Sequence, residues 1–170
     1  QSPIVQAISL ILSGDPEVYF ISFTSIRFSL VSTLIASVIS VPLGALIGLK
    51  EFRGKRPLLV VLNTLMALPT VVVGLFAYSL LSRAGPLGFL GLLFTPAAVI
   101  IGQAVLILPL IISLVYGALS RMQRELPETL LTLGASRSQM LWTTIREARI
   151  GILSAVLAGF GRVIGEVGVA

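Results

Sequence analysis

Residues 121–149, RMQRELPETLLTLGASRSQMLWTTIREAR, form a charged segment between long apolar runs, and the rest of the chain is organised around it. Glu128 is placed to begin a helix, Gly134 to end it, and Ser136 to cap a second helix. The segment therefore predicts a short helix–turn–helix outside the bilayer, a form suited to docking a soluble partner. The alternative is an ordinary polar connection between two spans, although connections of this length usually carry a function.

The composition around this segment is that of a membrane protein. Hydrophobic residues make up 56% of the 170 and charged residues only 11%, and the mean hydropathy is +1.05, whereas soluble domains are about 25% charged. Uncharged runs longer than about 20 residues indicate helices rather than barrel strands. We therefore expect an all-α integral membrane protein, a multi-span helical bundle forming one domain over residues 1–170.

Several classes of function are disfavoured. The chain has no cysteine and no histidine, so it lacks disulfides, thiolate chemistry and the commonest general base. No glycine-rich loop ending in Gly-Lys-Ser/Thr is present to cradle a nucleotide. The net charge of +5 comes from basic residues clustered between spans, which argues against nucleic-acid binding. We expect neither an active site nor a cofactor bound by this chain.

About four spans can be placed along the sequence. The first runs from about residue 18 to 49, the second occupies the uncharged run 57–82, the third covers 95–119, and the fourth begins near residue 150. Small or hydroxylated residues recur every three or four positions along the first span. Such a face is typical of close helix packing, which we favour over a role in lining a substrate path. Pro109, inside the third span, indicates a kink.

The second span contains a helix break near its middle. Pro69 removes a backbone donor, and Asn63 and Thr70 place polar groups close by. Lipid cannot satisfy the carbonyl group that the break frees, so either another helix or a water-filled cavity must face it. Asn63 and Thr70 are therefore candidate pathway residues.

The topology follows from the lysine and arginine residues between the spans. They number one in residues 1–27, four in 50–56, one in 82–95 and five in 121–149. Basic residues concentrate on the cytoplasmic side of membrane proteins. The pattern predicts a multi-pass protein of the cell membrane whose N-terminus lies outside and whose 121–149 segment is cytoplasmic.

Two charges, Arg162 and Glu166, interrupt the fourth span four residues apart on one side of the helix. An arginine there costs on the order of 3 kcal/mol even on insertion scales. The residues therefore face protein or water rather than lipid. Three alternatives remain open: a structural pair that satisfies itself, a pathway or gate that meets an anion, or contacts with a C-terminal segment beyond Ala170.

The charged segment also carries a family resemblance. Residues 128–136, ETLLTLGAS, resemble the cytoplasmic coupling loop of permease subunits in binding-protein-dependent ABC importers, which has Glu-Ala-Ala, three residues and then Gly. The match holds at Glu128, Gly134, Ala135 and Ser136, while Thr129 and Leu130 replace the alanines. The resemblance implies that the loop contacts a separate ATPase subunit, which binds the ATP and Mg. The expected coupling residues are Glu128, Leu133, Gly134, Ala135 and Ser136.

A second resemblance narrows the group. Residues 162–168, RVIGEVG, resemble the Arg-x-x-Gly-Glu-x-Gly stretch of oxyanion importer permeases for sulfate, molybdate and tungstate, and segments 13–16, 67–74 and 147–153 are most similar to the tungstate permeases. This implies a homodimeric permease, with its C-terminal part missing here, that receives an oxyanion from an external binding protein. Alternatives are a molybdate or sulfate permease, an ATP-independent secondary transporter or channel, and a membrane scaffold.

Overall fold

A computed structural model describes residues 16–92, 94–125, 130 and 132–167. Every regular element in these residues is a helix, as expected for an all-α membrane protein. The predicted coupling residue Glu128 and segment 13–15 lie outside the described part of the chain. The elements are α2 (Pro16–Leu49), α3 (Lys55–Met66), α4 (Thr70–Leu81), the short 3-10 helix η1 (Gly88–Leu90), α5 (Pro96–Glu125), α7 (Arg137–Glu147) and α8 (Arg149–Val167).

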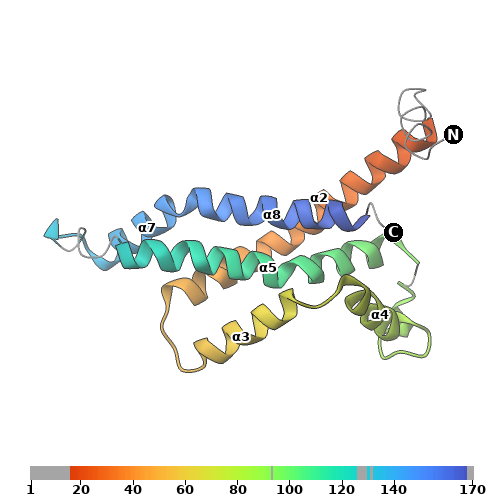
Figure 1. The fold of residues 1–170 in the computed structure, drawn as a ribbon, viewed down its shortest axis with the longest axis horizontal. Helices are drawn as coiled ribbons and strands as arrows, with labels where there is room; N and C mark the ends of the chain where they lie inside the picture. Colours follow the sequence, from red (N-terminus) through yellow and green to blue (C-terminus); the bar gives the residue numbers. More distant parts are fainter. Residues whose placement is uncertain (1–15, 93, 126–129, 131, 168–170) are drawn as a thin grey trace.

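Three long helices, α2, α5 and α8, lie side by side and give the molecule its elongated shape (Figure 1). Helices α2 and α5 run in the same direction and α8 runs in the opposite one. Within the described residues, α5 packs against each of the other α-helices. Its fully buried side chains recur every fourth residue, which places them on one face. They are Ile107, Ile111, Val115 and Leu119.

The interface between α2 and α5 uses the small face that the sequence predicts. Ser29, Ser40, Gly44 and Gly48 are buried on α2. A Cβ atom added to Gly44 would lie 2.8 Å from the Cβ of Val115, closer than real side chains come. The two backbones can approach because these residues are small, which confirms that this part of the face packs against a helix.

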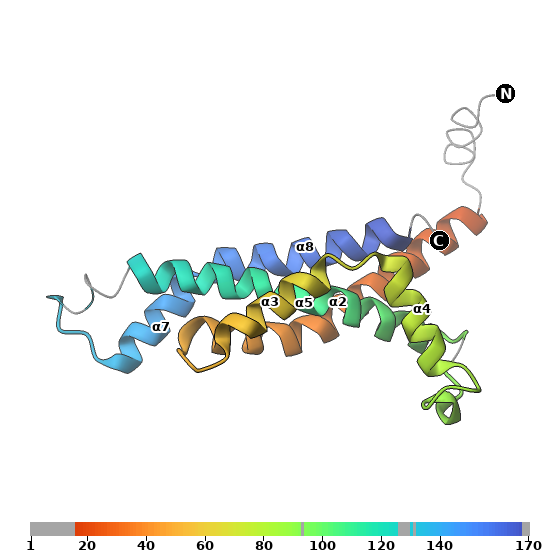
Figure 2. The ribbon, with the colours of Figure 1, turned by 60° about the horizontal axis from the view of Figure 1, so that its bottom comes forward.

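The second apolar run is broken more sharply than a proline kink. Helices α3 and α4 contain 12 residues each and meet at an angle of 97° at a break next to Pro69. At 1.5 Å per residue each helix is about 18 Å long, short of the ~30 Å hydrocarbon core. Figure 2 shows α4 turning away from the bundle. Neither helix is long enough to cross alone, so the two together form either a broken span or a re-entrant loop.

The helix before the charged segment is longer than the sequence predicts. We expect the third span to end at Leu119, but α5 continues to Glu125. No glycine or proline follows Gly117 until Pro127, so nothing stops the helix once it leaves the apolar region. It also continues through Pro109.

The fourth span begins at a bend around Ala148, the one residue between α7 and α8. Helices α7 and α8 meet at 46°, and the amide of Ala148 donates to the carbonyl of Thr144 at 3.0 Å, while that of Ile152 donates to Ala148 at 2.9 Å. In the described residues, α2 and α5 are long and apolar enough to cross a membrane, and counting each bent pair as one span gives up to four. This agrees with the expected number.

Candidate functional site

Glu166, near the end of α8, is hydrogen-bonded to Thr70, the first residue of α4. The Thr70 hydroxyl donates to Oε1 of Glu166 at 2.7 Å. The break next to Pro69 places the start of α4 here, because it turns the chain by 97°. Two of the four predicted pathway residues, 96 positions apart in sequence, are thus in direct contact.

Arg162 is a weaker partner of the same carboxylate. Its Nη2 lies 3.9 Å from Glu166 Oε1, and the two side chains are 36% and 33% exposed. A pair this long and this exposed contributes little to stability. Arg162, Glu166 and Thr70 together form what we call the α4–α8 polar cluster. Its chemistry is compatible with either a structural pair or a pathway residue, so the role of these charges stays a prediction.

A cavity of about 260 Å³ lies beside this cluster, between α4, α5 and α8. Its polar lining comes from Thr70, Glu166 and Gln103. Gly74 and Gly102 also line it, and they have no side chains to fill the space. Oε1 of Gln103 accepts a hydrogen bond from Ser32 on α2 at 2.9 Å. The cavity therefore lies between the cluster and Gln103, the residue of α5 that is hydrogen-bonded to α2.

Gln103 is a site residue that the sequence reasoning did not select. The sequence does point to this residue, because a side-chain amide inside an otherwise apolar span needs a hydrogen-bond partner. Asn63, by contrast, was selected but does not join the cluster. It lies on α3, before the break, with an exposed side chain. Within the described part of the chain that side chain makes no hydrogen bond, so only three of the four predicted residues come together.

The described part of the coupling loop has two well-defined helix boundaries. Gly134 has φ +75°, and the amide of Ala135 donates to the carbonyl of Leu130 at 3.0 Å. This six-to-one bond around a left-handed glycine is the Schellman ending of a helix. The sequence assigned that ending to Gly134.

Ser136 then begins α7 as predicted. Its hydroxyl accepts from the amide of Gln139 at 3.4 Å, and Oε1 of Gln139 accepts from the amide of Ser136 at 2.8 Å. The two bonds form a reciprocal capping box. The turn is therefore fixed by its own residues.

The loop projects from one end of the bundle (Figure 1). Leu133, at its turn, is 77% exposed, and Trp142 on α7 is 70% exposed. Ala135 is half-buried, and Gly134 and Ser136 are exposed. A self-capped turn that presents an exposed leucine is a suitable docking surface. Its coupling role stays a prediction.

Comparison with known proteins identifies the family. The family described as binding-protein-dependent transport system inner membrane component matches residues 40–170. The chain belongs to this family. It is a multi-pass membrane permease of ABC importers, a transport subunit rather than an enzyme, and its family works with ATPase and binding-protein partners.

Individual relatives match nearly the whole chain. The tungstate uptake system permease protein TupB of Peptoclostridium acidaminophilum is 43% identical over 95% of this chain and 71% of its own length. The TupB protein of Campylobacter jejuni is 37% identical over 97% of this chain and 69% of its own. A probable anion ABC transporter permease of Haloferax volcanii is 36% identical over 88% and 66%. The chain thus spans about seven tenths of the length of these relatives.

Proposed function

We propose that this chain is the permease subunit of an ATP-driven importer that moves tungstate into the cytoplasm. The observation that carries the proposal is its 43% and 37% identity to two tungstate uptake permeases over nearly its full length. Molybdate and sulfate are the alternative cargoes, because molybdenum and sulfate transport permeases are also relatives of this chain, at 27–30% identity. The external binding protein delivers the oxyanion and supplies most of the selectivity.

The direction of the chain across the membrane is supported by the distribution of charge in the fold. The basic turn at 50–56 and helix α7 lie at one end of the bundle, whereas the start of α2 and helix α4 lie at the other (Figure 1). Basic residues mark the cytoplasmic side. The N-terminus is then outside, and the 121–149 segment is cytoplasmic.

The coupling loop is the contact with the ATPase in this proposal. Glu128, Leu133, Gly134, Ala135 and Ser136 form the docking surface, and ATP and Mg bind in the partner. Two copies of the permease enclose the path as a homodimer. The observation that supports the contact with the ATPase is the exposed, self-capped turn at Gly134 and Ser136, whose shape does not depend on a partner.

The α4–α8 polar cluster acts as a gate rather than a high-affinity site. The carboxylate of Glu166 repels an anion, and Arg162 offsets that charge only when it faces the path. The hydrogen bond between Thr70 and Glu166 links two segments that have to separate if the path opens between α4 and α8. Asn63 remains a predicted lining residue on α3, away from this contact.

The test is uptake of tungstate by proteoliposomes that contain the full-length permease, its ATPase and its binding protein. Uptake is expected to need ATP and to resist an excess of sulfate or molybdate. Uptake by the permease alone would favour an ATP-independent transporter. Preferential uptake of molybdate would replace the proposed cargo.

A matched pair of variants tests the coupling surface. Leu133→Ala removes an exposed side chain at the loop, and Leu87→Ala removes an exposed leucine near η1. We expect Leu133→Ala to abolish most of the substrate-stimulated ATP hydrolysis and Leu87→Ala to preserve it, with both proteins inserted and folded. Equal activities would remove Leu133 from the contact.

A further inference from the structure

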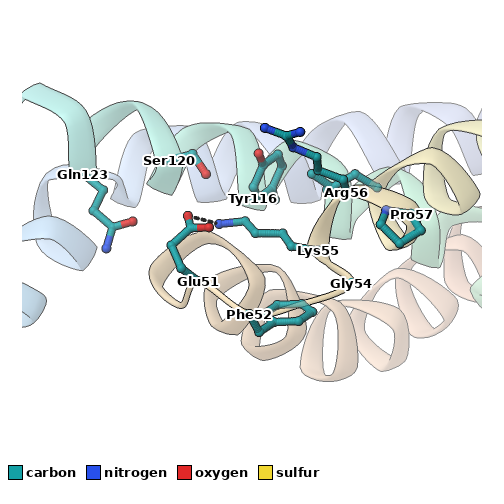
Figure 3. A pocket seen from close by; sticks show the side chains of 10 residues that line it. Glu51, Phe52, Gly54, Lys55, Arg56, Pro57, Tyr116, Ser120 and Gln123 are labelled. Atoms are coloured by element: carbon teal, nitrogen blue, oxygen red, sulfur yellow. Dashed lines mark hydrogen bonds and ion pairs between the residues drawn. The ribbon is translucent and has the colours of Figure 1, made fainter.

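A polar pocket of about 620 Å³ lies at the same end of the bundle as the basic turn, away from the α4–α8 polar cluster. Figure 3 shows its lining. One wall is the turn from Glu51 to Pro57, and the other is the last part of α5, which contributes Tyr116, Ser120 and Gln123. Neither the transport path nor the coupling loop makes use of it.

A buried lysine forms the centre of the pocket. Lys55 is only 8% exposed. Its Nζ donates to Glu51 Oε1 at 2.7 Å and to the carbonyl of Lys50 at 3.2 Å, and it lies 5.5 Å from the centre of the Tyr116 ring. These contacts engage two of its three N–H groups. A buried ammonium is costly unless it is fully paired, so the third favours an additional acceptor.

Two other residues of the same lining carry donors. The hydroxyl oxygen of Ser120 is buried and has no hydrogen-bond partner among the described residues. The Arg56 guanidinium extends past the Tyr116 ring (Figure 3). The pocket therefore offers two cations and a spare hydroxyl. It contains one carboxylate, Glu51, whose side chain is 85% exposed at the mouth.

The position of the pocket limits what can occupy it. It begins where the uncharged part of α2 ends, at Lys50, and so lies at the level of lipid headgroups. Phe52 and Leu58 beside it are 44% and 36% exposed, which provides apolar surface for acyl chains. Basic pockets between helices at this level are suited to acidic headgroups.

We propose that this pocket binds the phosphate group of an anionic membrane lipid. Lys55 and Arg56 supply the positive charge, and Ser120 supplies an O–H donor. The phosphate accepts from the third N–H of Lys55 Nζ, and Glu51, which the added negative charge repels, turns into the water it already faces. The proposal does not depend on which oxyanion is transported.

The test measures phosphatidylglycerol binding to the assembled transporter in detergent, by native mass spectrometry, with phosphatidylcholine as the neutral reference. Arg56→Gln is expected to weaken binding at least about tenfold, because it removes a hydrogen bond to a charged group. Glu51→Gln is expected to strengthen it by a similar factor, because it removes the competing carboxylate. Arg53→Gln, in the same turn but outside the lining, is the matched control and is expected to weaken binding no more than about fivefold, the contribution of one basic residue near a membrane surface without direct contact.

The direction of the Glu51→Gln effect separates the proposal from a purely structural ion pair. Weaker lipid binding by Glu51→Gln would overturn it, because a structural pair loses stability without gaining an anion. Equal effects of Arg53→Gln and Arg56→Gln would reduce the site to general surface charge and overturn it too. Displacement of the lipid by millimolar inorganic phosphate would show a soluble anion as the occupant. Glu51→Gln and Arg56→Gln keep the test valid even if a Lys55 substitution fails to fold.

Discussion

Replacing Thr70 with valine removes the hydroxyl that holds Glu166 while keeping nearly the same volume. A hydrogen bond to a charged group contributes about 1.5–3 kcal/mol, and we take the lower end because the site is a third exposed. The Arg162 contact is longer, at 3.9 Å, and pairs of this kind contribute less than about 1 kcal/mol. Thr70→Val should therefore destabilise the protein more than Arg162→Gln does.

The assay is thermal unfolding of the purified permease in detergent, followed by circular dichroism. A loss of about 1.5 kcal/mol lowers the Tm of a chain of this size by roughly 3–6 °C. Thr64→Val is the matched control. Among the residues that the structure describes, the Thr64 hydroxyl bonds only to the Val60 carbonyl one turn back in its own helix, so this substitution should change Tm by about 1 °C or less.

In a Glu166→Ala background, Thr70→Val should have almost no further effect. A full Tm decrease in that background would refute the reasoning, as would Arg162→Gln destabilising more than Thr70→Val.

Three further experiments probe the packing and the loop. Gly44→Ala should lower the free energy of unfolding by about 1–3 kcal/mol, because its Cβ would meet Val115 at 2.8 Å. Gly161→Ala, whose Cβ would have no atom within 4 Å, should raise it by up to about 1 kcal/mol. Changes of the same sign in denaturation experiments would contradict this packing. Gly134→Ala forces alanine to φ +75° at a cost of about 1–2 kcal/mol, so hydrogen exchange of the amides at the turn should accelerate. Gly134→Asn should accelerate this exchange less, because asparagine tolerates the left-handed conformation better. The reverse order would argue against the left-handed turn. Ser136→Ala loses a helix cap that contributes about 1 kcal/mol, and unchanged amide exchange in the first turn of α7 would show that the cap is dispensable.

The sequence was most informative where a single residue sets the local structure. Gly134 and Ser136 define the loop, because each acts within a few residues of itself. Pro69 likewise marks a break, but the missing amide does not set an angle. The 97° turn depends on how α4 packs against α5, so it could not be read from the sequence.

The candidate site depends on contacts between distant segments. Sequence spacing identified Arg162 as the partner of Glu166, since the two lie four residues apart on one helix. The shorter contact comes from Thr70, which only the turn at Pro69 brings to α8. The bond between Ser32 and Gln103 similarly depends on the register of α2 against α5. Helical periodicity describes one face of one helix and does not specify this register.

Helices α7 and α8 follow each other with only Ala148 between them, so the two can move together as one bent arm. Ala148 is buried, its amide bonds to α7 and its carbonyl bonds to α8, so a displacement of α7 is passed on to α8. From Arg149 to Glu166 the arm is about 26 Å long, and a tilt of about 5° moves its far end by about 2 Å. That displacement is comparable to the 2.7 Å between Thr70 and Glu166 and is enough to separate them. A small rotation at the loop can thus release a contact at the opposite end of the bundle.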